Sequence, residues 1–199
     1  MMAPDAQMQA VRSICETYCR YVKAWSGPPA AELVARCLAE VADCLEPGQR
    51  AQLLSQKPAL MDFAQSACTV QSHLDFNVAN FVADSGRWWI LDIADAGLRL
   101  PATYDVNNIL LNEAYQGRST HLLDAALSSP VGTGHHDVLR ATIGRATARD
   151  FRVSLLLNAV LRESRHVASA LRADWHPSHI PHRWRLLERS IAGWPSVDG

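Results

Sequence analysis

The stretch Ser72–Gly97, SHLDFNVANFVADSGRWWILDIADAG, alternates short apolar runs with aspartate and asparagine. Its runs NFVA and RWWILDI are rich in Val, Ile and Trp, which favour strands, and the DSG between them suits a tight turn. The segment is therefore predicted to form a β-hairpin. Because a hairpin brings the outer ends of its two strands together, polar residues just before the first strand and just after the second are expected to be neighbours.

The sequence on both sides of this segment has helical periodicity, with apolar residues at steps of three and four and breaks at SGPP and EPGQ. Helices are predicted at about 5–25, 30–45 (after Pro29), 49–67 (one or two helices, broken near Pro58), 105–115, 119–127, 136–172 and 178–193. The segment 128–136, which ends in His135 and His136, is predicted to be a surface loop. The expected fold is mainly α with a small β-hairpin (α+β), in one domain over 1–199: a helical segment 1–71, a hairpin segment 72–110 and a helical segment 111–199.

The composition is that of an ordinary globular protein, with 48% hydrophobic and 20% charged residues among 199. A net charge of −1 argues against a nucleic-acid-binding protein that depends on overall charge. No apolar run reaches the roughly 18 residues of a membrane span, and the N-terminus does not resemble a signal peptide. We therefore expect a cytoplasmic protein with no membrane or nucleic-acid partner.

Oxygen-bearing side chains flank the predicted hairpin on both sides. Asp75 and Asn80 lead into its first strand, and Asp92 ends its second strand. One carboxylate at such a site could accept a proton from a hydroxyl, while an amide oxygen and a second carboxylate hold Mg²⁺. These groups meet the needs of phosphoryl transfer, which depends on positioning and on neutralisation of charge.

Three motifs in this region resemble those of one enzyme superfamily. HLDFNVAN resembles the HxDxxxxN catalytic loop of aminoglycoside and choline kinase-like phosphotransferases, and ILDIADAG resembles the IDxxxAG segment that follows it. LPATYDVNNIL is similar to the DPAYDLA element, with Tyr104 and Asp105 matching its Tyr-Asp pair. The resemblance covers about residues 72–110, with the motifs in the family's order, and it implies the helical architecture of a kinase C-terminal lobe.

The resemblance also implies a role for each matching residue. Asp75 would be the catalytic base and His73 would brace the catalytic loop, while Asn80 and Asp92 would bind the cofactors, Mg²⁺ and the phosphates of ATP. Asp105 would be structural and would anchor the following helix beneath the loop. The implied reaction is ATP- and Mg²⁺-dependent phosphorylation of a hydroxyl on a small molecule.

The sequence departs from the family pattern in three respects. Leu74 stands where the small-molecule kinases have Gly, and Leu100 replaces an acid before Pro101. The region before His73 has a helical pattern in place of the family's β-rich nucleotide lobe, and neither Lys23 nor Lys57 matches its strand lysine. Three interpretations stay open: an upstream lobe missing from the reading frame, a lobe supplied by a partner chain or a second copy, or a catalytically inactive lobe that serves as a binding protein.

A row of arginines lies in the C-terminal third of the sequence. Because acidic residues are interleaved with them, we expect these arginines to cover a solvated helix face. They are Arg140, Arg145, Arg149, Arg152, Arg162 and Arg165.

Overall fold

The computed structural model describes residues 4–74, 76–77, 80–84, 87–90, 97–115 and 120–190. Within these ranges the protein is mainly helical with two small antiparallel strand pairs, which confirms the predicted fold class. No helix there combines the length and the apolarity that crossing a bilayer requires.

The N-terminal helices follow the predicted periodicity closely. They are α1 (Pro4–Trp25), α2 (Ala31–Cys44), α3 (Pro47–Ser55) and α4 (Lys57–Ser66). In α1 the buried positions Val11, Ile14, Tyr18 and Val22 repeat at steps of three and four, so that one face packs into the core. Both α3 and α4 carry a proline in their first turn, where its missing N–H costs no helical hydrogen bond.

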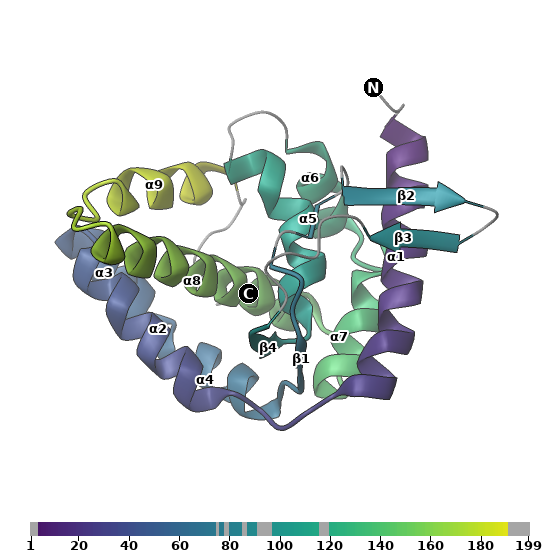
Figure 1. Cartoon of the computed structure of the whole chain (residues 1–199), viewed down its shortest axis with the longest axis horizontal. Helices are drawn as coiled ribbons and strands as arrows, with labels where there is room; N and C mark the ends of the chain where they lie inside the picture. The colour runs from purple at the N-terminus through teal and green to yellow at the C-terminus, as the bar shows by residue number, and fades with distance from the viewer. Residues whose placement is uncertain are drawn as a thin grey trace.

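The strands form two separate antiparallel pairs. The predicted hairpin is present as β2 (Phe81–Asp84) and β3 (Arg87–Ile90), and in the view of Figure 1 it extends outward past α1. The other pair, β1 (Thr69–Gln71) and β4 (Arg99–Pro101), flanks the hairpin segment on both sides. The prediction of a wholly helical segment up to residue 71 was therefore wrong at its end, because a three-residue strand shows no periodicity and its partner lies 30 residues further along the chain.

Five helices complete the described chain: α5 (Thr103–Tyr115), α6 (His121–Ser128), α7 (His135–Ile143), α8 (Ala148–Arg172) and α9 (Ile180–Ser190). The predicted continuous stretch 136–172 is in fact the two helices α7 and α8. Gly144 ends α7 with a φ of +76°, and Thr147 begins α8 by exchanging hydrogen bonds with Asp150. A left-handed glycine stops a helix, and such reciprocal capping starts one, so the break has a local cause.

The helix α8 forms the centre of the core. It contacts α2, α4, α5, α7 and α9, and Figure 1 shows it crossing the middle of the body. Residues 153–161 of α8 are buried without interruption, which is typical of a helix enclosed on all sides.

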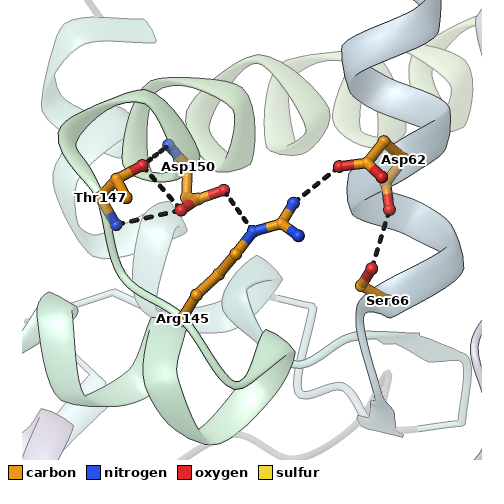
Figure 2. Close-up of polar contacts among 5 residues, drawn as sticks. All are labelled: Asp62, Ser66, Arg145, Thr147 and Asp150. Carbon is orange, nitrogen blue, oxygen red and sulfur yellow. Dashed lines mark hydrogen bonds and ion pairs between the residues drawn. The ribbon is translucent and has the colours of Figure 1, made fainter.

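Arg145, in the turn between α7 and α8, connects that turn to α4. Its guanidinium donates to Asp150 Oδ1 at 3.0 Å and to Asp62 Oδ2 at 2.6 Å (Figure 2). Asp150 also accepts from the hydroxyl of Thr147 at 2.7 Å. This arginine is thus part of an ion-pair network, so the expectation of a wholly solvated arginine face was incomplete. Arg162 departs from it too, because its guanidinium lies 4.1 Å from the centre of the Tyr115 ring.

His135 is buried, which corrects the prediction that it lies in a surface loop. Only 1% of its surface is exposed, and its Nε2 lies 3.2 Å from the carbonyl oxygen of Val106. The preceding Gly134 has a φ of +79°, and a Cβ there would come within 2.8 Å of Cys15. The close packing of α7 on α1 therefore encloses the imidazole. Burial lowers the pKa of His135 to about 4.

Acid should destabilise the fold partly through His135. Between about pH 4 and 6.5 the unfolded chain binds a proton at this imidazole and the folded chain does not, so falling pH favours unfolding by about 3 kcal/mol over that range. Urea unfolding at pH 7 and pH 4.5 should show a smaller pH dependence for His135→Gln than for the unsubstituted chain. The same change at the half-buried neighbour His136 is the control. An unchanged pH dependence in His135→Gln would contradict the prediction.

Candidate functional site

A buried carboxylate holds the segment that joins β1 to the hairpin. Asp105 lies in the first turn of α5 with 1% of its surface exposed. Its Oδ1 accepts from Ser72 Oγ at 2.5 Å and from the backbone N–H of Leu74 at 3.4 Å. Its Oδ2 accepts from the backbone N–H of His73 at 3.1 Å and from the Tyr18 hydroxyl at 3.0 Å. Burial raises the pKa of Asp105, and these four donors offset part of the rise.

Leu74 has a left-handed backbone, with a φ of +67°. This conformation costs a residue with a Cβ about 1–2 kcal/mol, and it persists only where the surroundings impose it. Here the N–H of Leu74 also donates to Ser72 Oγ at 3.1 Å, and its carbonyl accepts from Asn108 Nδ2 at 3.4 Å. The structure therefore requires at this position the backbone that glycine would adopt without strain.

The segment Ser72–Leu74, which Asp105 holds by hydrogen bonds, contributes to the lining of two cavities. One, of about 390 Å³, lies toward α1, and we call it the aromatic cavity. Side chains that line it are Tyr18, Tyr21, His73, Phe76, Phe81 and Ile90. The other, of about 640 Å³, is the α2–α8 groove, and its lining includes Leu74, Leu98 and Leu100. The consecutive residues His73 and Leu74 thus line different cavities.

The imidazole of His73 is a polar group within the aromatic cavity. The residue is 8% exposed, and neither ring nitrogen has a hydrogen-bond partner among the described residues. Its ring contacts Phe76 edge to face, with 6.0 Å between ring centres. The hydrogen bond that holds His73 to Asp105 comes from its backbone and not from its ring.

Only part of the predicted catalytic set falls within the described residues. Asn80 directly precedes β2, and its backbone N–H donates to the carbonyl of Asn77 at 3.1 Å. Asp75 and Asp92 lie outside the described residues. Phe81 of β2 pairs with Ile90 of β3 at one end of the strand ladder. In sequence, Asn80 directly precedes Phe81, and Asp92 follows Ile90 by two residues.

The possible metal ligands of this region are oxygen donors. The amide oxygen of Asn80 is of the type that Mg²⁺ prefers. The hairpin register pairs Phe81, the residue after Asn80, with Ile90, which lies two residues before Asp92 in sequence. Within the described ranges, no three His, Cys, Asp or Glu side chains form a group that could hold a metal ion. The predicted role of Asn80 as a magnesium ligand therefore stays a prediction.

Several residues of the site could not be identified from the sequence. Tyr18 reaches Asp105 from α1, 87 residues away, and nothing in the α1 pattern distinguishes it from a core tyrosine. Asn158 in α8 donates to the carbonyl of Tyr104 at 2.7 Å and to Asn108 Oδ1 at 3.2 Å. An asparagine within an otherwise apolar run of α8 is the one signal that could have indicated a buried polar contact there.

Comparison with known proteins identifies the architecture. No family model matches the chain, and no curated protein matches it in sequence. Among solved structures, two crystal forms of glucosamine kinase are similar to it, with TM-scores of 0.51 and 0.52 and 18% identity in each case. The fold is kinase-like. The similarity extends over 95% of this chain but only 53% and 51% of the glucosamine kinase chains, so this chain spans about half their length.

The left-handed backbone of Leu74 can be tested with a pair of substitutions. We expect Leu74→Gly to be more stable than Leu74→Ala by about 1 kcal/mol, because only glycine adopts this φ without strain. The matched control is Ser169, exposed in α8, where the alanine variant should be the more stable by about 1 kcal/mol. Urea unfolding measures both pairs. The same order at both positions would show that Leu74 is not strained.

Asp105 should contribute more to stability than an exposed aspartate does. Asp105→Asn puts an NH₂ group among N–H and O–H donors, so we expect a loss of about 2–4 kcal/mol. Asp43→Asn, which removes an exposed ion pair with Arg50, should cost under about 1 kcal/mol. Thermal and urea unfolding of the two variants compare these losses. Equal losses in the free energy of unfolding would mean that the buried Asp105 carboxylate stabilises the fold no more than an exposed ion pair does.

Proposed function

We propose that this chain is the C-terminal lobe of an ATP- and Mg²⁺-dependent phosphotransferase of the aminoglycoside and choline kinase-like superfamily, acting on a hydroxyl of a small molecule. The kinase-like fold supports this, together with the three motifs around the hairpin. The observation that carries most weight is the fixation of Ser72–Leu74 by Asp105, since this segment leads directly to Asp75 and borders the α2–α8 groove.

The proposed chemistry assigns a role to each motif residue. An acceptor hydroxyl in the α2–α8 groove attacks the γ-phosphorus of ATP, the new O–P bond forms, and the bond to the bridging oxygen breaks to release ADP. Asp75 accepts the hydroxyl proton. Asn80 and Asp92 would hold Mg²⁺, which when bound would neutralise charge on the phosphates. The ring of His73 contacts Phe76 edge to face and would brace the catalytic loop.

We further propose that the nucleotide is enclosed by another lobe, which lies upstream in the same protein, in a partner chain or in a second copy. The chain spans about half the length of the glucosamine kinase chains, and its hairpin carries exposed apolar side chains. Val82 and Trp89 are directly paired across the strands and are 45% and 54% exposed. Such a face is suited to being covered by another protein surface.

The same exposed pair supports the alternative that this is a catalytically inactive lobe with a binding role. In that case partner binding would depend on the exposed hairpin face and not on the carboxylates of Asp75 and Asp92. Val82→Lys would then abolish partner binding, whereas Asp75→Asn and Asp92→Asn would leave it unchanged.

Phosphotransfer should depend on Asp75 and Asp92. With ATP, Mg²⁺ and a panel of aminoglycosides, choline and sugars, we expect the purified chain to bind nucleotide and to phosphorylate an acceptor. Asp75→Asn should lower kcat by about 100-fold or more, and Asp92→Asn should weaken Mg²⁺ binding. Asp174→Asn, in the exposed turn after α8, is the matched control and should have no effect. Full activity of Asp75→Asn would overturn the proposed function. No affinity of the purified chain for ATP and none for Mg²⁺ would end the hypothesis that this chain alone catalyses phosphotransfer.

A further inference from the structure

The α2–α8 groove has a wall of arginines, which follows from helical periodicity. On α8, Arg165, Ser169 and Arg172 recur at steps of four and three, and on α2 Arg36 and Glu40 are four residues apart. Residues with this spacing share one helix face, and α2 and α8 pack against each other. All five side chains therefore line the same groove, whose remaining lining includes several leucines.

The negative charge in this lining is already paired. Glu40 accepts a hydrogen bond from Ser164 Oγ at 2.5 Å, and its other oxygen lies 3.8 Å from Nε of Arg36. Glu40 and Arg36 together therefore add no net charge to the groove. The positive charge of Arg36 is likewise offset by this contact.

In the part of the chain that the structure describes, Arg165 and Arg172, in contrast, donate hydrogen bonds to neutral groups. Arg165 donates to the Tyr104 hydroxyl at 3.4 Å, and Arg172 donates to Ser169 Oγ at 3.2 Å. Neither forms an ion pair with an acidic side chain in the described part of the chain. Two guanidinium groups in one groove without acidic partners favour an anionic ligand, because arginine binds carboxylate and phosphate through paired N–H donors.

Arg165 lies close to the residues that hold the segment Ser72–Leu74. Its partner Tyr104 precedes Asp105, which holds the segment that ends at Leu74, and Leu74 lines the same groove. Arg172 lies about 10 Å further along the α8 axis, at 1.5 Å per residue. A small molecule in the groove could thus contact an arginine while a hydroxyl lies toward Leu74.

We propose that the α2–α8 groove binds a hydroxylated small molecule that carries a carboxylate or phosphate, with Arg165 and Arg172 as its anion-binding residues. Its role as the acceptor site rests on the proposed function. The groove then disfavours cationic acceptors such as aminoglycosides and choline, which the sequence resemblance implies, and it determines the acceptor class by charge.

Calorimetry without nucleotide tests the binding step alone. The probes are glucose, glucosamine and glucose 6-phosphate, which share a ring and differ in charge. We expect glucose 6-phosphate to bind about tenfold or more tightly than glucose, and glucosamine to bind more weakly than either. Arg165→Gln and Arg172→Gln should each remove about tenfold of the affinity for glucose 6-phosphate. The matched control is Arg152→Gln, an exposed arginine of α8 outside the groove, which should leave the affinity unchanged.

Equal or absent binding of the three sugars would overturn this inference, as would equal effects of Arg152→Gln and the two groove variants. The result is separable from the proposed function. Selective binding of glucose 6-phosphate without phosphoryl transfer would support the anion site and contradict the enzyme. Phosphorylation of glucosamine that is unaffected by Arg165→Gln and Arg172→Gln would support the enzyme and contradict the anion site.

Discussion

The hydrogen bonds to the Asp105 carboxylate connect three parts of the chain that are far apart in sequence. Tyr18 reaches it from α1, Ser72–Leu74 surrounds it from the loop after β1, and the residue itself belongs to α5. A carboxylate removed from water is costly unless its oxygens are satisfied, so the positions of these elements depend on one another. The loop that leads to Asp75 is therefore held by the core itself.

This constraint has a consequence for the two cavities. With the backbone fixed on both sides of Leu74, the ring of His73 lines the aromatic cavity and Leu74 lines the α2–α8 groove. The left-handed φ of Leu74 is a local cost that the surrounding hydrogen bonds offset. The groove and the aromatic cavity thus share one wall, and a change in that wall would alter both.

The kinase-like fold and the charge of the groove bear on different questions. Similarity to glucosamine kinase concerns the backbone, and a fold of this kind is compatible with many acceptors. Under the proposed function, selection of an acceptor depends on the side chains that line the groove. Among the described residues, the acidic Glu40 is paired with Arg36, whereas Arg165 and Arg172 donate hydrogen bonds to hydroxyls, so the balance of charge favours anions.

The sequence by itself determined the helices of the N-terminal half, the hairpin and the fold class, because each has a local signal of periodicity, turn residues or strand-forming residues. Local signals did not reveal the pair β1 and β4, the burial of His135 or the contact of Tyr18 with Asp105, since each depends on a partner far away in the chain. The break between α7 and α8 had a signal in Gly144, but helical periodicity on both sides obscured it. Which face of each helix meets which neighbour, and therefore which arginines line the groove, was decided only by tertiary packing, because hydrophobic burial is non-directional and many pairings satisfy the same pattern.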